Sequence, residues 1–269
     1  MRIALFSDSH TFSPPSSWNA CFDKRAIGLV NYFYIRKHKH NPKYLEKVVQ
    51  KILDISPDMV ICTGDLTTSG DSPEFDLSCS ILSPLVENQS FELFYVLGNH
   101  DYYVKDKVCY EALRKAFCYL NRGRFNLEDL PQSLEIKDLD FCFVNVCKPV
   151  NLFVSYARMS RKNRDFIINW AEKKTQKPKI LVEHYPLIEE HPVLRCRHKL
   201  WGEKQVLQKL QSGEIDLSLC GHVHCPTQKL DERGRGEVII GSATANKCFA
   251  LIEYDENSDV FKYNKISVE

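Results

Sequence analysis

The sequence lacks any apolar run long enough to cross a bilayer. Its first stretch, "MRIALFSDSH", reaches a charged residue after a few apolar ones, which is too short for the core of a signal peptide. It also lacks an excess of either charge, because 36 Lys and Arg stand against 35 Asp and Glu. We therefore expect neither a nucleic acid nor an anionic membrane as an obligatory partner, and any anion site must be local.

No C-x-x-C pair occurs among the eleven cysteines. Several of them, including Cys62, Cys142 and Cys220, lie inside apolar runs, where cysteine acts as a small hydrophobic residue. This usage predicts reduced thiols and a cytoplasmic location. The sequence also lacks a P-loop, a G-x-G-x-x-G and a G-x-S-x-G, which argues against nucleotide-driven motors, dinucleotide oxidoreductases and serine hydrolases.

Short apolar runs recur along the chain and predict strands, most of them buried on both faces. Seven such runs cover residues 3–7, 59–64, 92–98, 141–147, 179–183, 215–221 and 236–243. Two later runs, residues 248–255 and 260–266, alternate more strictly and favour antiparallel strands.

Apolar residues at helical spacing lie between the strands and predict three helices. The first has Asn41 as its N-cap, Pro42 at its first position and Leu45, Val48, Val49, Ile52 and Leu53 on one face. The second begins at Ser72 and carries Phe75, Cys79, Leu82 and Val86. The third is opened by Ser160 and carries Phe166, Ile167, Trp170 and Ala171. This order predicts one α/β domain over residues 1–269, with helices covering two packed, mixed sheets.

Two segments have the character of insertions. Residues 11–41 and 187–203 mix aromatic residues with Arg, Lys and His, and we expect them to form a rim or lid over a site. In the first segment the aromatic residues Trp18, Phe22, Tyr32, Phe33 and Tyr34 stand beside Arg36, Lys37 and Lys39. They suit an acyl chain, a stacked base or peripheral membrane contact, with the cations meeting phosphate. The alternative is a solvated amphipathic helix face, and the sequence leaves both open.

Polar residues follow five of the predicted strands. They are Asp8-Ser9-His10, Gly64-Asp65, Gly98-Asn99-His100-Asp101, His184, and Gly221-His222-Val223-His224. Ligands of open α/β sheets bind outside the carboxyl ends of the strands, so we expect these side chains to converge.

The donor types indicate the chemistry. Two carboxylates, an amide oxygen and four imidazoles, with one imidazole to spare, are too many for one tetrahedral zinc site. They suit two divalent ions of the Mn, Fe, Zn or Co type that share one carboxylate. Two ions about 3.5–4 Å apart stabilise the attacking and leaving oxygens of a phosphoryl displacement. The pattern therefore predicts a hydrolase.

The stretches "SDSH", "GDLTTSG", "GNHD", "EHYP" and "GHVH", in this order, resemble the calcineurin-like metallophosphoesterase superfamily and in particular its small bacterial phosphodiesterase-type members. The resemblance implies a four-layer α/β/β/α sandwich with two mixed sheets. It also implies that Asp65 bridges two metals, one held by Asp8, His10 and His224 and the other by Asn99, His184 and His222. His100 would protonate the leaving oxygen, and Asp101 would orient His100 through its other ring nitrogen.

Three points stay open in the sequence. His191 and His198 follow His184 closely, and we favour His184 because it directly follows a predicted strand. The expected reaction is hydrolysis of a phosphodiester or diphosphate bond of a small-molecule or lipid-linked substrate by a metal-bridging hydroxide. A cyclic-nucleotide phosphodiesterase and a UDP-diacylglucosamine-type diphosphate hydrolase are the specific alternatives, and an inactive protein-binding scaffold is a third. The oligomeric state is left undecided.

Overall fold

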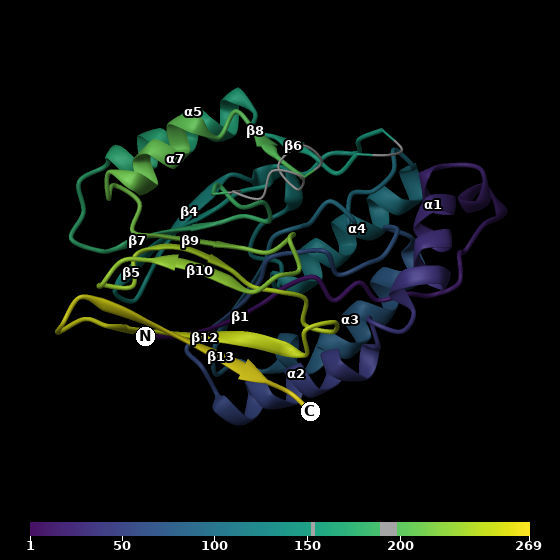
Figure 1. The fold of residues 1–269 in the computed structure, drawn as a ribbon, viewed down its shortest axis with the longest axis horizontal. Helices are drawn as coiled ribbons and strands as arrows, with labels where there is room; N and C mark the ends of the chain where they lie inside the picture. The colour runs from purple at the N-terminus through teal and green to yellow at the C-terminus, as the bar shows by residue number, and fades with distance from the viewer. Residues whose placement is uncertain (152–153, 189–197) are drawn as a thin grey trace.

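A computed structural model of the chain describes residues 1–151, 154–188 and 198–269, apart from the side chains of residues 19, 21, 35 and 36. Its main elements are two large sheets that face each other, with helices on their outer surfaces (Figure 1).

The first sheet has five strands in the order β13-β12-β1-β2-β3. Three of them run parallel: β1 (Arg2–Phe6), β2 (Met59–Cys62) and β3 (Glu92–Tyr95). The hairpin of β12 (Cys248–Asp255) and β13 (Val260–Ser267) pairs with β1 antiparallel. The parallel register places Leu5 opposite Ile61 and Ile61 opposite Phe94, so these three strands end at the same edge.

The second sheet has six strands in the order β10-β11-β9-β7-β5-β4. Its four central strands are parallel: β5 (Leu139–Phe143), β7 (Lys179–Val182), β9 (Leu217–Cys220) and β11 (Gly236–Ile239). The edge strands β4 (Gln132–Ile136) and β10 (Thr227–Leu230) pair antiparallel. A short parallel pair, β6 (Ala157–Arg158) and β8 (Leu200–Trp201), lies outside both sheets.

The three expected helices are present. They are α2 (Pro42–Ile55), α3 (Ser72–Glu87) and α5 (Arg161–Glu172). Asn41 and Ser160 cap α2 and α5 as the sequence predicts, whereas Asp71 rather than Ser72 caps α3. Asp71 accepts from the Ser72 N–H, so Ser72 is the first residue inside the helix.

Further helices and helical turns lie outside the three helices that the sequence predicts. They are α1 (Lys24–Asn31), α4 (Lys107–Leu120) and α7 (Lys204–Gln211), with shorter helical turns η1 (Trp18–Cys21), η2 (Tyr32–Arg36) and η3 (Leu127–Asp129). In Figure 1, α2 and α3 cover the outer face of the first sheet, and α5 and α7 cover the second. The expected α/β/β/α arrangement is thus confirmed.

The inner faces of the two sheets form one apolar core. Phe94 on β3 stacks on Phe143 on β5, with ring centroids 4.5 Å apart. The nine cysteines that the structure describes with their side chains carry no disulfide. Among the described residues, no helix has both the length and the apolar character required to cross a bilayer.

Candidate metal centre

The loops after five parallel strands bring their polar side chains to one place. In a first group, Asp8, His10, Asp65 and His224 each offer a ligand atom within 4.8 Å of the others. In a second group, Asp65, His184 and His222 do the same. Asp65 belongs to both groups, which makes this a dinuclear-type metal-binding cluster.

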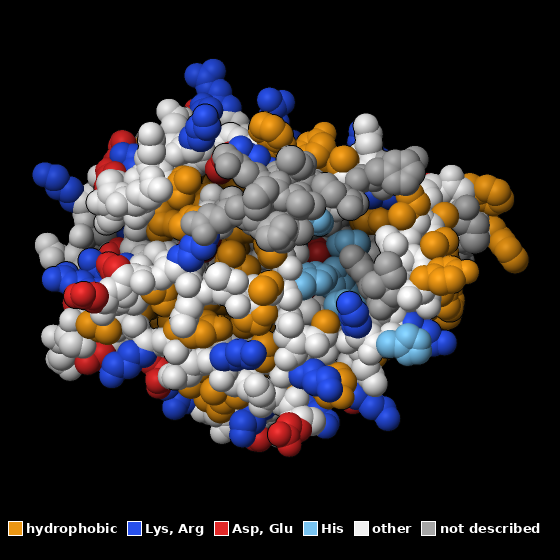
Figure 2. Space-filling model, viewed as in Figure 1, with side chains coloured by type: hydrophobic (Ala, Val, Ile, Leu, Met, Phe, Trp, Pro, Cys, Tyr) orange, Lys and Arg blue, Asp and Glu red, His pale blue; other side chains and the backbone are white. Residues whose placement is uncertain are grey.

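Individual distances show how close the donors lie. The Nε2 atom of His10 is 3.8 Å from Asp8 Oδ1 and 3.7 Å from Asp65 Oδ2. His184 Nε2 lies 3.5 Å from Asp65 Oδ2, and His224 Nε2 lies 3.2 Å from Asp8 Oδ1. Figure 2 shows histidine side chains gathered around a hollow, with an acidic side chain behind them.

Several of these donors are buried without a hydrogen-bond partner in the described part of the chain. They include Asp8 Oδ1, Asn99 Oδ1, His184 Nε2 and His222 Nδ1. A buried polar atom without a hydrogen bond costs roughly 1–3 kcal/mol. Asp8 Oδ1 and His184 Nε2 have the ionic contacts given above, so Asn99 Oδ1 and His222 Nδ1 are the atoms that most clearly indicate a bound cation. The donors are oxygen and imidazole nitrogen without thiolate, which fits ions of the Mn, Fe, Zn or Co type.

The loop from Thr63 to Gly70 orients three of the imidazoles. The carbonyl oxygens of Thr67, Thr63 and Thr68 lie 3.2, 2.6 and 2.6 Å from the Nδ1 atoms of His10, His184 and His100, respectively. Because a carbonyl oxygen only accepts, each Nδ1 carries a hydrogen, and Nε2 is left as the nitrogen that can bind a metal or a further proton. For His10 and His184 this is the tautomer that binds a metal through Nε2.

The backbone of the cluster is strained. Asp8, His10, Asp65, His222 and His224 have φ values between 46° and 72°, in the left-handed region. Each such residue costs on the order of 1–3 kcal/mol and persists only when its surroundings hold it there. The strain coincides with the candidate ligands, which indicates that the fold maintains it for their placement.

Two glycines allow loops to approach each other at the cluster. A Cβ at Gly98 would overlap the Asp65 carboxylate, and a Cβ at Gly221 would overlap Ser7 and Asp8. Gly98 therefore serves close packing against the shared carboxylate rather than an unusual turn.

Charges within the cluster are strongly coupled. Burial opposes the charge on Asp65, yet the imidazoles of His184 and His100 hold the pKa of this carboxyl well below its usual range. Burial likewise opposes the charge on His184, but Asp65 raises the pKa of His184 to about 9. Burial and the neighbouring His184 lower the pKa of His222 well below its usual value. A metal bound by His184 would therefore replace a proton.

Asp101 does not occupy the position that the resemblance implied. Its carboxylate accepts from the Thr67 and Gly98 N–H groups and from the Tyr95 hydroxyl, at 2.8–3.0 Å. The Nδ1 atom of His100 instead faces the Thr68 carbonyl. Burial and the charge of Asp65 raise the pKa of Asp101 to about 6. Asp101 thus joins the β2 and β3 loops, and a backbone carbonyl performs the orienting contact that had been expected of it.

Two further histidines, His198 and His40, lie beside the cluster; the sequence offered His198 only as an alternative to His184 and predicted no role for His40. His198 Nδ1 lies 3.2 Å from His222 Nε2. The other ring nitrogen of His222, Nδ1, has no hydrogen-bond partner among the described residues. His198 therefore accompanies His222 rather than replacing His184, while His191 lies outside the described residues. His40 is buried, with its ring centroid 4.9 Å from that of His10. Only the positions of these two along the chain, inside the suspected insertions, hinted at the site.

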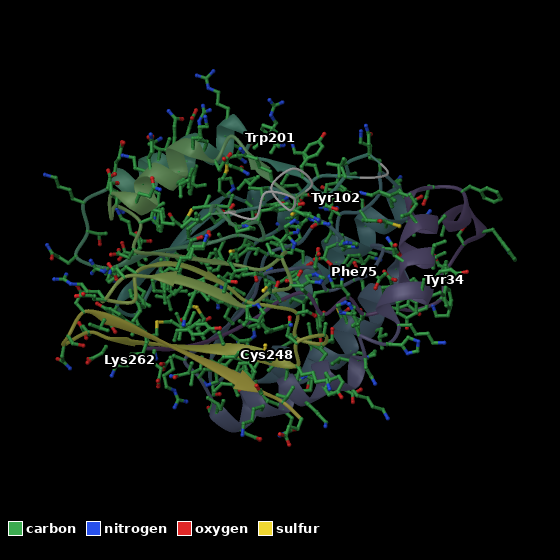
Figure 3. The ribbon with its side chains drawn as sticks, in the orientation of Figure 1. Tyr34, Phe75, Tyr102, Trp201, Cys248 and Lys262 are labelled. Atoms are coloured by element: carbon green, nitrogen blue, oxygen red, sulfur yellow. The ribbon has the colours of Figure 1, made fainter. Side chains whose placement is uncertain are left out.

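The first insertion is fixed to the fold at one end and exposed along its outer side. Arg25 is buried and binds Asp23, with Asp71 3.6 Å away. The aromatic residues singled out in this insertion differ in their surroundings. Tyr32 stacks on Phe12, whereas four others are exposed, namely Trp18, Phe22, Phe33 and Tyr34. Tyr34 points away from the body of the molecule in Figure 3. The side chain of Arg36 is outside the described part, as is most of the second insertion.

Comparison with known proteins agrees with this geometry. A family model described as calcineurin-like phosphoesterase matches residues 1–226. An uncharacterized metallophosphoesterase of Campylobacter jejuni is 34% identical over 89 residues, which make up 33% of this chain and only 23% of the relative.

Solved structures share the fold at low identity. The TT1561 protein of Thermus thermophilus superposes with a TM-score of 0.55 at 15% identity, over 98% of this chain and 97% of its own. A dimetal phosphatase from Danio rerio gives a TM-score of 0.58 at 14% identity, over 100% and 99% of the two chains. With the family model covering most of its length and the fold and cluster in place, the chain belongs to the calcineurin-like phosphoesterase family.

Proposed function

We propose that this chain hydrolyses a phosphodiester or diphosphate bond of a small-molecule or lipid-linked substrate at a centre of two divalent ions. The observation that carries the proposal is the membership of Asp65 in both groups of ligand atoms. Bound there, two ions of the Mn, Fe, Zn or Co type would make a water nucleophilic at neutral pH and offset charge on the phosphoryl group.

The two groups of donors support the division of ligands that the family pattern implies. Asp8, His10 and His224 would hold one ion, and His184 and His222 would hold the other, with Asp65 between them. Asn99 joins the second set in this proposal, because its buried Oδ1 has no partner among the described residues and its side chain lines the same hollow. The proximity of the six carboxylate and imidazole donors supports an enzyme over an inactive scaffold.

His100 is the proposed proton donor to the leaving oxygen. It lines a hollow of about 200 Å³ together with Asp65, Asn99 and His222. Its Nδ1 is anchored by the Thr68 carbonyl, so the ring presents Nε2 in a fixed orientation. Asp101 is a positioning residue in this account, because it holds Gly98 and Thr67 and through them the two loops that carry His100 and Asp65.

The remaining parts of the proposal concern the whole chain. We keep as proposals a single metallophosphoesterase domain over residues 1–269 and a rim or lid formed by residues 11–41 and 187–203, of which residues 189–197 lie outside the described part. We also propose a cytoplasmic location with reduced thiols, from the cysteine usage of the sequence. The exposed Trp18, Phe22 and Tyr34 leave a lipid-linked substrate or contact with a membrane surface open.

Hydrolysis of bis(p-nitrophenyl) phosphate with added Mn²⁺ tests the function. Asn99→Ala should lower kcat/KM by two orders of magnitude or more, because a ligand of one ion is lost. Asn257→Ala, which changes an exposed asparagine in the β12–β13 turn, is the matched control and should match the wild type. A metal-loaded wild-type protein without activity on this diester or on any phosphate ester would contradict the proposal.

A further inference from the structure

A second hollow lies beside the metal centre and has no part in the function described so far. It measures about 380 Å³, and its lining includes Asp23, Lys24, Tyr103, Lys105 and Asp106. Tyr103 and His100 connect it to the hollow over the metal ligands, since their rings stack at a centroid distance of 4.9 Å and an angle of 15°.

Lys24 is the central cation of this second hollow. Its ammonium group lies 4.3 Å from the centroid of the Tyr103 ring, a favourable cation–π distance. Burial lowers the pKa of Lys24 to about 8, and the charge of Asp65 opposes that decrease. The lysine therefore sits partly desolvated, within the electric field of the metal centre.

The two carboxylates that line the hollow are engaged elsewhere. Asp23 accepts from the Arg25 backbone N–H and binds the Arg25 guanidinium. Asp106 caps α4 by accepting from the Cys109 N–H. In the described part of the chain neither Lys24 nor Lys105 forms an ion pair with a carboxylate. The hollow therefore offers its positive charge to a ligand.

The helix that carries Lys24 is packed firmly against the catalytic loops. A Cβ added at Gly28 would be 3.5 Å from Ser69 Cβ and 3.6 Å from Tyr103, so the backbone of α1 lies directly on the loop that orients His100. Arg25, only 3% exposed, also contacts Cys109 in α4. The backbone that carries Lys24 is thus fixed, and Lys24 contacts the Tyr103 ring that stacks on His100, as a specific binding group requires.

We propose that Lys24 and Tyr103 form a second anion subsite on the leaving-group side of His100, and that the substrate is a diphosphate diester rather than a simple phosphodiester. This inference rests on the proposed function. Water would add its oxygen to one phosphorus and release a proton to solvent. The P–O bond to the bridging oxygen would break, and the second phosphate would depart with that oxygen and a proton from His100. The departing phosphate gains negative charge as the bond breaks, and the Lys24 ammonium stabilises that charge.

Competition against bis(p-nitrophenyl) phosphate tests the subsite in the Mn²⁺-loaded full-length protein. ADP-ribose, a diphosphate diester, is compared with AMP, which carries the same nucleoside and a single phosphate. For the wild type, ADP-ribose should have an inhibition constant at least tenfold below that of AMP. Lys24→Gln should raise the inhibition constant of ADP-ribose at least tenfold. The inhibition constant of AMP and the turnover of bis(p-nitrophenyl) phosphate should change at least tenfold less than that.

Lys107→Gln is the matched control, because Lys107 is an exposed lysine at the start of α4 outside the second hollow. It should leave both inhibition constants unchanged, and Lys24→Arg should restore most of the wild-type affinity. Equal effects of Lys24→Gln on ADP-ribose and AMP, or no effect on either, would overturn the subsite.

Calorimetric titration of ADP-ribose into the same variants after removal of metal with EDTA keeps the test independent of turnover. Lys24-dependent binding by a protein that hydrolyses no ester would retain the subsite and contradict the proposed function. Hydrolysis of bis(p-nitrophenyl) phosphate, together with ADP-ribose binding that does not depend on Lys24, would support the proposed function and contradict the subsite.

Discussion

The candidate metal ligands and the first insertion lie at the same site but differ in how far their side chains are exposed. Asp8, His10 and His184 are at most 1% exposed and follow parallel strands whose register brings their ends together. The insertion of residues 11–41 exposes Trp18 to 85% and Tyr34 to 83%, yet it places Lys24 beside the centre. If both proposals hold, reaction type depends on strained, buried loops, whereas substrate choice depends on a helix packed over them.

The largest effect should come from Gly98→Ala, which acts on the first of these regions. Its Cβ would overlap the Asp65 carboxylate, so the shared ligand must move. We expect kcat/KM for bis(p-nitrophenyl) phosphate to fall at least a hundredfold and the metal content of the protein to drop. Gly28→Ala, in the insertion, meets only ordinary contacts and should keep its full metal content. Full metal content and activity in Gly98→Ala would show that Asp65 does not require this close approach.

His100→Ala should separate chemistry from metal binding. General acids contribute about 10²–10⁴-fold to rate, and a good leaving group such as p-nitrophenolate needs little protonation. The variant should keep its metal but lose about a hundredfold more rate on an alkyl phosphodiester than on the p-nitrophenyl ester. Equal losses on the two substrates, measured side by side, would exclude the acid role.

The smallest expected effect concerns Glu74, which binds the loop from Thr63 to Gly70 that both regions contact. Glu74 is fully buried and accepts from the Ser69 N–H at 2.7 Å, and burial raises its pKa to about 8 from the ordinary 4.5. The unfolded chain releases this proton at lower pH than the folded chain, so stability falls as pH rises from about 4.5 to 8.

Glu74→Gln should flatten that decline by up to about 1.4 kcal/mol per pH unit. Denaturant unfolding between pH 5 and pH 8 measures the slope. Glu46→Gln, on the exposed face of α2, is the control and should keep the wild-type slope. An unchanged slope in Glu74→Gln would show that this carboxyl is ionised in the folded protein at neutral pH.

Strong periodic patterns made the fold largely predictable. The apolar runs ended within a few residues of the observed strands, and the capped helices α2 and α5 begin where Asn41 and Ser160 indicate. The helix α4 was missed although Cys109, Leu113 and Phe117 recur at helical spacing after the cap residue Asp106. That signal was available in the sequence. The edge strand β10 was not visible, because its residues, Thr-Gln-Lys-Leu, form no apolar run or alternating apolar face.

The centre was predictable only where side-chain types carry the signal. Seven candidate ligands stood out because carboxylates, imidazoles and an amide followed strands. The Thr63, Thr67 and Thr68 carbonyls that orient three histidines are backbone groups, which every residue possesses, so no residue type reveals them. His198 and Lys24 reach the site through tertiary packing of segments with no strand pattern, which a single sequence does not encode locally.

Anomalous scattering from crystals grown with Mn²⁺ tests the central claim most directly. We expect two peaks about 3.5–4 Å apart, both within bonding distance of the Asp65 carboxylate, with Asn99 and His184 on one of them. A single ion far from Asp65, or two ions that do not share it, would contradict the account.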